Sequence, residues 1–450
     1  MRDVLLENVD LITMDPDLGV IENGYLAIKN GRIEALGSCS QLQPGDYANY
    51  QRITGPKYGK RFIALPGFIQ THVHTSQALG RGLADDVDLI TWTRKRIWPY
   101  EAALTEEDVY VSALLSAAEM LKSGTTTFCE ASGAKPDAIG QAVIDSGMRG
   151  IICLSTMDLP GEIPPESRMN TAEALEKNLD VVERWQGRHD RVGACFNVLN
   201  LFLSSEELWR SLTELALEKK VFLQTHLAES LDEVAFIREK SGKTPVQYLD
   251  SLGALGSHLL AAHVVHVDDR DLVTLQERDV RVLHCPGAGL RIAGIARIPE
   301  MLERGILISL GTNSPPCNNR MSMLDEMWLA GIMHKAVENN PEAVPARSVV
   351  EMATINGAKT LGMDKELGSL TVGKKADIVI MDFNKLCTTP THDLLSTLVY
   401  QANNAVVHTV MVEGEILVDA GELTSIKEEW LITEAERRAQ EIVQRANIRF

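Results

Sequence analysis

The pattern of hydrophobic and polar positions changes twice along the chain, near residue 66 and near residue 366. Between these points, short apolar runs alternate with longer stretches whose apolar residues recur every three or four positions. Short runs bounded by turn residues predict buried strands, and the wider spacing predicts amphipathic helices. Outside these points, short apolar runs are separated by glycine-containing turns, which predicts β structure at both ends of the chain.

The middle part contains eight apolar strand candidates, each followed by a stretch that favours a helix or a long loop. The strands are predicted at residues 68–74, 125–130, 150–156, 193–200, 221–229, 259–267, 280–286 and 306–313. Helices are predicted at residues 105–123, 136–146, 171–188, 205–219, 268–279 and 298–304. Eight repeats over about 300 residues predict a (β/α)8 TIM-like barrel. An open doubly wound sheet would usually carry a glycine-rich phosphate loop after its first strand, and this chain has none there.

The two ends of the chain predict one further unit. Strands are expected at residues 4–6, 9–13, 25–29 and 32–36, with Asn30 and Gly31 at a tight hairpin turn. Two helical stretches, 324–336 and 346–361, precede a return to strands at residues 368–382 and 406–418. We therefore expect a barrel of residues 66–365, a small discontinuous β-sandwich domain of residues 1–65 and 366–425, and a C-terminal helix at residues 426–450.

Composition narrows the class of protein. The chain has 450 residues, 45% of them hydrophobic and 24% charged, which is typical of a globular protein. Its net charge of −18 argues against nucleic-acid and anionic-membrane partners. No apolar run reaches the ~18 residues of a membrane span, and acidic residues occupy the place of a signal-peptide core. Seven cysteines without a Cys-x-x-Cys pair indicate reduced thiols. We expect a cytoplasmic protein with a small-molecule substrate.

Polar residues that can bind a metal stand at the ends of several predicted strands. His72 and His74 end the first strand, and alternate residues of a strand point to one face. His226 and His263 end the fifth and sixth strands, and Asn313 ends the eighth. One such histidine alone is more often a hydrogen-bonded structural residue. Because the carboxyl ends of barrel strands converge, several together predict a metal site.

These motifs resemble the amidohydrolase superfamily. The resemblance rests on residues 66–74, 123–127, 226–229, 262–266, 311–313 and 368–377. It points to the branch that holds guanine, cytosine and adenosyl-type deaminases together with bacterial hydrolases of s-triazines, phenylureas and thiocarbamates. The resemblance implies that His72, His74 and His226 ligate one divalent metal, most often zinc, with iron and cobalt as alternatives. It implies that Glu229 shuttles protons, and that His263, rather than His266, contacts the water or the substrate.

The sequence departs from this family pattern at two metal-site positions. Asn313 stands where the family has an aspartate that ligates the metal and acts as a base. An amide oxygen can ligate, but it cannot take up a proton at neutral pH. We expect Asn313 to belong to the ligand and catalytic sets, although the substitution is also typical of an inactivated site. The fourth strand lacks the lysine that bridges two metals in binuclear members, which predicts one metal per chain.

A third departure concerns the substrate. The loops at residues 199–205 and 286–294 lack the hydrogen-bonding residues expected of adenosine-type deaminases. A pocket without such groups discriminates poorly in favour of a polar purine. The remaining candidates for the pocket are largely apolar: Trp92, Trp98, Met157, Leu201 and Phe202. Trp92 and Trp98 are equally compatible with a core or a subunit interface. The loops therefore favour a compact hydrophobic xenobiotic substrate.

Three hypotheses follow. The first is a mononuclear metal hydrolase that cleaves the C–N bond of an amide, phenylurea or (thio)carbamate herbicide. The second is a deaminase or chlorohydrolase that acts on a triazine or purine-like heterocycle, and the released amine, ammonia or chloride separates the two. The third is a non-catalytic metal-binding protein in which Asn313 marks lost activity. We also expect a homo-oligomer, a dimer or larger, with residues 324–336 or 92–100 supplying the contact.

Overall fold

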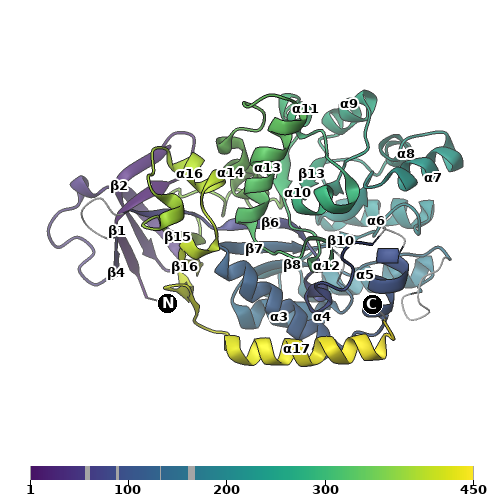
Figure 1. The fold of residues 1–450 in the computed structure, drawn as a ribbon, viewed down its shortest axis with the longest axis horizontal. Coiled ribbons are helices and arrows are strands. Elements are labelled where there is room, and N and C mark those ends of the chain that lie inside the picture. The colour runs from purple at the N-terminus through teal and green to yellow at the C-terminus, as the bar shows by residue number, and fades with distance from the viewer. Residues whose placement is uncertain (1, 56–60, 88–90, 132, 161–167, 449–450) are drawn as a thin grey trace.

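The computed structural model describes residues 2–55, 61–87, 91–131, 133–160 and 168–448 and has an α/β architecture (Figure 1). Two parallel sheets lie in the middle of the chain, and helices pack around them. A third, mixed sheet is built from both ends of the chain and lies to the side of the parallel sheets. No helix within the described ranges combines the length and the apolar character that a membrane span needs.

The eight predicted parallel strands form, with one of them divided in two. The first sheet has the order β6 (Phe68–Val73), β7 (Thr125–Glu130), β8 (Arg149–Ile152) and β9 (Val192–Ala194). The second has the order β10 (Phe196–Asn197), β11 (Leu223–Leu227), β12 (Leu259–His263), β13 (Arg281–His284) and β14 (Ile308–Leu310). Every neighbouring pair in both sheets is parallel. Their carboxyl ends therefore face the same side.

Backbone hydrogen bonds connect the two parallel sheets at both edges. Between β9 and β10, the Cys195 N–H donates to the Ile152 carbonyl at 3.0 Å. At the other edge, Val73 and Asn313 form an isolated parallel bridge. There the Asn313 N–H donates to the His72 carbonyl at 3.1 Å. These contacts bring the end of β14 next to the end of β6, where the histidine motif lies.

Six helices occur where the hydrophobic period predicts them: α3 (Glu106–Lys122), α4 (Pro136–Ser146), α5 (Thr171–Trp185), α6 (Glu206–Lys219), α9 (Asp269–Glu277) and α11 (Ile298–Glu303). A capping box starts α3, because Thr105 and Asp108 bond each other's backbone N–H. Two helices between β11 and β12 were not predicted, α7 (Leu231–Ser241) and α8 (Pro245–Leu252). In α7, the apolar residues Leu231 and Phe236 are exposed. The apolar residues of this helix therefore do not all lie on one face, and the periodic pattern that predicts a helix is weak.

The remaining helical elements connect or flank this framework. They are η1 (Cys39–Gln41), η2 (Thr75–Gly80), η3 (Trp92–Ile97), α2 (Trp98–Ala102), α10 (Pro286–Ala288), η5 (Gly289–Ala293), α12 (Pro315–Asn318), α13 (Met323–Val337), α14 (Ala346–Ala353), α15 (Ile355–Thr360), η6 (Leu386–Thr388), α16 (Leu394–Tyr400), η7 (Asn404–Val406) and α17 (Glu428–Arg445). The predicted C-terminal helix is therefore present as α17, which runs along α3 (Figure 1).

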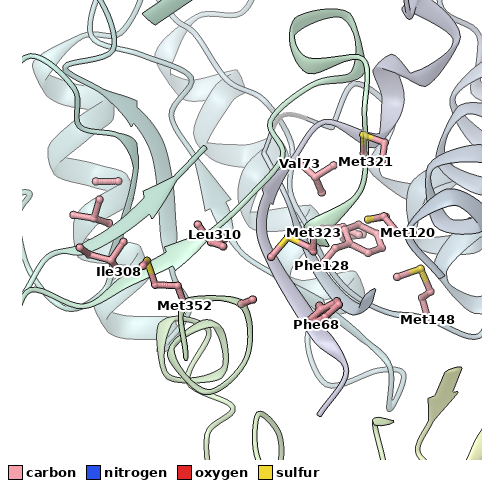
Figure 2. Close-up of a cluster of buried hydrophobic side chains, with 14 of the residues drawn as sticks. Phe68, Val73, Met120, Phe128, Met148, Ile308, Leu310, Met321, Met323 and Met352 are labelled. Carbon is pink, nitrogen blue, oxygen red and sulfur yellow. The ribbon is translucent and has the colours of Figure 1, made fainter. Parts of the chain in front are cut away.

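A continuous hydrophobic core fixes the position of β6, the strand that carries His72. Phe68 and Val73 of β6 pack with Phe128 of β7, Met120 of α3 and Met323 of α13 (Figure 2). All five side chains are buried. Burial of a side chain of this size contributes about 1.5–3 kcal/mol, so the strand is held firmly against its neighbours.

Strands from both ends of the chain join in one nine-stranded sheet. Its path is β18 (Glu422–Leu423), β17 (Glu415–Asp419), β16 (Val407–Val412), β15 (Ile378–Asp382), β5 (Phe62–Pro66), β1 (Val4–Ile12), β2 (Val20–Lys29) and β3 (Arg32–Ser38), with β4 (Gln51–Thr54) paired to β1. The hairpin turn at Asn30 and Gly31 is confirmed, with positive φ at both residues. These hydrogen bonds define a single sheet, and the sandwich of two facing sheets stays a prediction.

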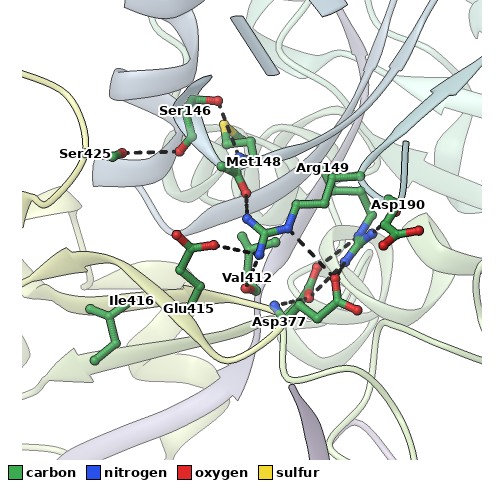
Figure 3. A network of polar contacts seen from close by, with 12 residues as sticks. Ser146, Met148, Arg149, Asp190, Asp377, Val412, Glu415, Ile416 and Ser425 are labelled. Carbon is green, nitrogen blue, oxygen red and sulfur yellow. Dashed lines mark hydrogen bonds and ion pairs between the residues drawn. The ribbon is translucent and has the colours of Figure 1, made fainter. Parts of the chain in front are cut away.

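A buried ionic cluster joins this sheet to β8 (Figure 3). Arg149, at the start of β8, is 3.3 Å from the Asp377 carboxylate, and both side chains are about 5% exposed. The Arg149 guanidinium also lies 3.6 Å from Glu413. Burial opposes the charge on Arg149, but Asp377 and Glu413 raise its pKa above the ordinary value.

Candidate metal centre

Three histidine side chains converge at the carboxyl ends of β6 and β11. His72 lies in β6, His74 directly follows it, and His226 lies in β11. Their potential ligand nitrogens all lie within 4.8 Å of one another. The Nε2 atoms of His74 and His226 are 3.4 Å apart. The structure therefore brings together the three histidines that the sequence singles out as ligands.

Carbonyl groups set the orientation of two of these rings. His72 Nδ1 lies 3.2 Å from Gln224 Oε1, and His226 Nδ1 lies 2.8 Å from the Leu199 carbonyl. Because these oxygens only accept, each Nδ1 carries the proton and each Nε2 keeps a lone pair. Within the described part of the chain, the buried Nε2 of His72 has no hydrogen-bond partner. An unpartnered buried nitrogen beside two further imidazoles fits a divalent cation.

The protonation state of the rings agrees with this fit. Burial, followed by the neighbouring histidines, lowers the pKa of His72 and of His74 well below the usual 6.5. Both rings are therefore neutral at pH 7. Neutral imidazole is the form that binds a metal, so the site requires no proton release from these two rings on binding.

Asn313 lies beside the three histidines. It follows β14, is 5% exposed and contacts His74 through a side-chain hydrogen bond. Its φ is +60°, a left-handed conformation that asparagine tolerates better than most residues. The sequence predicts Asn313 within the strand, but β14 ends at Leu310 and Asn313 is in the loop that follows.

Glu229 and His263 face each other next to the histidine cluster. The His263 Nε2 atom is 3.5 Å from Glu229 Oε1. Burial lowers the pKa of His263 to about 4 although the Glu229 charge opposes this, so His263 is neutral at pH 7. Glu229 follows Ala228, whose φ is +51°. The turn directs the Glu229 carboxylate into a cavity that Glu229 helps to line.

A cavity of about 880 Å³ opens onto this cluster. His74, His226, Glu229 and Asn313 contribute to its wall. Of the predicted pocket residues, Trp92, Trp98, Met157 and Phe202 also line it. This volume lies in the range of small-molecule sites, and the mixture of apolar walls with a few polar groups is typical of them.

Leu201 differs from the prediction, because it packs in the hydrophobic core and does not line the cavity. It is 1% exposed. The backbone N–H groups of Phe202 and Leu203 both donate to Asn200 Oδ1, which folds the loop into a tight turn. That turn presents Phe202 to the cavity and leaves Leu201 on the core side.

Gln77, Glu101 and Glu233 are among the polar residues of the cavity wall that were not predicted. Burial raises the pKa of Glu101 to about 7, although Gln77 Nε2 donates to it at 2.6 Å. Burial also raises the pKa of Glu233 to about 8, and Glu233 accepts the Glu229 N–H at 3.0 Å. The spacing of Ser230 and Glu233 was a usable signal, because Ser-x-x-Glu marks a helix start.

Two other histidines near the strand ends do not join the cluster of three. His266 lies 2.9 Å from the Ala293 carbonyl, and His284 lies 3.4 Å from His334. His266 was the less favoured alternative to His263, and its position agrees with that preference.

Comparisons with known proteins place the chain in a family. The model of the amidohydrolase family matches residues 63–417. The 5'-deoxyadenosine deaminase of Methanosarcina acetivorans is 36% identical over 449 residues, which cover 99% of this chain and 100% of the relative. The 5-methylthioadenosine/S-adenosylhomocysteine deaminase of Pelotomaculum thermopropionicum is 35% identical over 447 residues, with 99% and 100% covered.

Solved structures agree with this assignment. An adenosine deaminase from Xanthomonas campestris with bound zinc has a TM-score of 0.91 and 27% identity, covering 98% of this chain and 99% of that one. The atrazine chlorohydrolase of Arthrobacter aurescens TC1 complexed with zinc has a TM-score of 0.89 at 24% identity, covering 97% and 100%, and shows a shared fold. The chain therefore belongs to the amidohydrolase family and is a hydrolase that acts on carbon–nitrogen bonds.

Proposed function

We propose that this protein is a mononuclear metal-dependent aminohydrolase that removes the amino group of an adenine-like heterocycle as ammonia. The observation that carries the proposal is the cluster of His72, His74 and His226, which opens onto a cavity that Glu229 also lines. The full-length relatives named as deaminases at 35–36% identity support a nucleoside substrate. Because of these relatives, we favour a nucleoside over the phenylurea or carbamate that the loop sequences suggest.

We infer that His72, His74, His226 and Asn313 hold one divalent cation, with zinc the best-supported choice. A cation bound there would supply Lewis acidity, which lowers the pKa of water from ~16 toward ~7. The protein would contribute three imidazole rings and one amide oxygen as ligands. Because none of these groups is a carboxylate, they would neutralise less of the charge of a bound cation than an aspartate ligand would.

Glu229 is the residue we assign to proton transfer. Its carboxylate can take a proton from the attacking water and return it to the leaving nitrogen. His263, neutral and 3.5 Å away, can donate an N–H to the developing negative charge or hold Glu229 in place. Asn313 cannot share the proton work, because an amide is not a base at neutral pH.

The cavity can accommodate both parts of a nucleoside. Trp92, Trp98, Met157 and Phe202 offer apolar surface for a flat ring system. Gln77 and Glu101 offer buried donor and acceptor atoms on the same wall. These polar groups were not identified from the sequence as part of the pocket. Their presence removes the argument that the pocket lacks the hydrogen-bonding groups a polar purine needs.

The same proposal extends to the domain organisation. We propose that residues 66–365 form a closed (β/α)8 barrel, supported by the backbone contacts that connect the two parallel sheets at both edges. The strands of residues 1–65 and 366–425 would then form one discontinuous β domain at its side, supported by the pairing of β5 with β15.

The test is ammonia release from 5'-deoxyadenosine and 5'-methylthioadenosine. We expect the wild-type protein to release one ammonia per nucleoside consumed. Glu229→Gln should lower turnover by about 10²–10⁴-fold, because the proton carrier is lost, while the metal content stays at the wild-type value. Glu239→Gln, an exposed change on the neighbouring α7, is the matched control and should leave turnover unaltered. Full activity of Glu229→Gln would refute the role of Glu229.

A second candidate function is hydrolysis of a hydrophobic amide, phenylurea or thiocarbamate. Asn313 favours it, because the aspartate base of the deaminase pattern is missing, and the apolar part of the cavity wall agrees with it. Release of an aniline or alkylamine from such a substrate, without ammonia release from any nucleoside, would select this candidate. Chloride release from a chlorotriazine would select dechlorination.

A further inference from the structure

The peptide bond that precedes Asn313 is held on both sides. Its N–H, from Asn313, donates to the His72 carbonyl at 3.1 Å. Its carbonyl, from Thr312, accepts Asn318 Nδ2 at 2.9 Å. Rotation of this peptide plane would change φ of Asn313, which is +60°. The two hydrogen bonds therefore fix the backbone conformation that directs the Asn313 side chain.

A buried carboxylate holds the Asn318 amide in turn. Asn318 Nδ2 donates its second hydrogen to Glu326 Oε1 at 2.6 Å. The other oxygen, Glu326 Oε2, accepts the Gly287 N–H at 2.9 Å. Asn318 is 8% exposed and Glu326 is fully buried in α13. Since both hydrogens of Asn318 Nδ2 have acceptors, its side chain has one preferred orientation.

Gly287 makes this arrangement possible. A Cβ atom at that position would lie 2.6 Å from both Asn318 Oδ1 and Glu326 Oε1. Only glycine lets the backbone N–H reach the carboxylate without a clash. Glu326 thus connects the short helix α10, which follows β13 and contains Gly287, to the segment after β14, which contains Asn313 and Asn318.

We propose that Asn318 and Glu326 are positioning residues that hold Asn313 toward the three histidines. The proposal rests on the assignment of Asn313 to the ligand set. Neither residue lines the cavity, so neither is assigned a contact with substrate. A side chain that orients a metal ligand typically changes metal affinity about 10–100-fold when it is removed.

A double-mutant cycle with cobalt(II) as the probe tests the proposal. The variants are Asn318→Leu, Asn313→Ala and the double variant of the full chain, and cobalt affinity is measured by competition with a chelator. We expect Asn318→Leu to weaken cobalt binding about 10–100-fold and to alter the visible absorption of the cobalt protein. In the Asn313→Ala background, Asn318→Leu should have no further effect, because the group it positions is gone.

Asn178→Leu is the matched control. Asn178 is also buried, and its Nδ2 also bonds two acceptors, Thr156 Oγ1 and the Ala174 carbonyl, but it lies on α5 away from Asn313. This control should lower the thermal stability and leave the cobalt affinity unaltered. Glu326→Gln is the milder variant for the case in which Asn318→Leu does not fold. Its carboxamide offers one acceptor to two donors, so we expect a smaller loss of affinity.

Equal losses from Asn318→Leu in both backgrounds would overturn the proposal, as would unaltered cobalt affinity in Asn313→Ala. An incorrect proposed function would give a different experimental result. A protein that follows the expected cobalt cycle but releases no ammonia from nucleosides refutes the deaminase assignment and leaves the positioning role intact.

Discussion

At the scale of single residues, Asn313 is the position that most distinguishes this site. It stands where the family resemblance predicts a carboxylate, so the four candidate ligands are three imidazoles and one amide. A carboxylate at this position would add attraction for a cation without a large change in side-chain shape.

We therefore expect Asn313→Asp to bind cobalt(II) or zinc more tightly than the wild-type protein, by about tenfold or more, which corresponds to about 1.4 kcal/mol. Chelator competition at pH 7 measures this change. Equal or weaker binding by the variant would show that Asn313 does not face the cation.

The predicted histidine set shows what residue patterns can and cannot reveal. Alternation along a strand predicted that His72 and His74 point together, but β6 ends at Val73 and His74 starts the following turn. The two rings still approach, with centroids 5.2 Å apart. Glu101 was not predictable in the same way, because its raised pKa depends on burial by elements distant in the sequence.

At the scale of elements, Asp108 links the start of α3 to the C-terminal helix α17. It caps α3 through Thr105 and accepts hydrogen bonds from Arg438 and Arg445 of α17. Burial alone would raise the pKa of Asp108, but the hydrogen bonds from Thr105, followed by those from Arg445 and Arg438, outweigh it and lower the pKa below the usual 3.8. The charged form therefore stabilises the docking of α17.

We expect Asp108→Asn to lower the free energy of unfolding by about 2 kcal/mol at pH 7, because hydrogen bonds to a charged group are lost. Since the folded pKa is depressed, this contribution is complete above pH 3.8 and disappears as the pH falls through the lower folded value. Urea unfolding at pH 7 and below pH 3.8 measures both. Glu107→Gln is the control, because Glu107 meets the same Arg438 but is 80% exposed. It should cost less than about 1 kcal/mol.

Element boundaries were the weakest part of the prediction. Strands β11, β12 and β14 end two to four residues earlier than the apolar pattern suggests. Ala228, His263, Val264 and Asn313 adopt positive φ at these ends. Apolar residues in such turns resemble strand residues in sequence, but their backbone conformation is no longer that of a strand.

At the scale of the whole molecule, the Arg149 cluster connects the nine-stranded sheet to the parallel strands (Figure 3). Removal of one partner from a buried ion pair leaves an uncompensated charge. The pairing of distant segments was predictable from the β pattern at both ends of the chain. The single Arg149–Asp377 contact was not, because no local pattern relates residues 228 positions apart.

We expect Asp377→Ala to lower the free energy of unfolding by about 3–5 kcal/mol. Arg347→Ala, which removes the exposed pair of Arg347 with Glu351 on α14, should cost less than about 1 kcal/mol. Denaturant titration of both variants measures the difference. Equal stability of the two would show that the buried cluster does not hold the sheet in place.

The most direct test of the whole account is the metal content of the purified protein and of His226→Ala, measured by elemental analysis after exposure to zinc. We expect about one zinc per wild-type chain and almost none in the variant, because the proposed site would hold one ion between three imidazoles. Two zinc ions per wild-type chain, or the same content in both proteins, would contradict it.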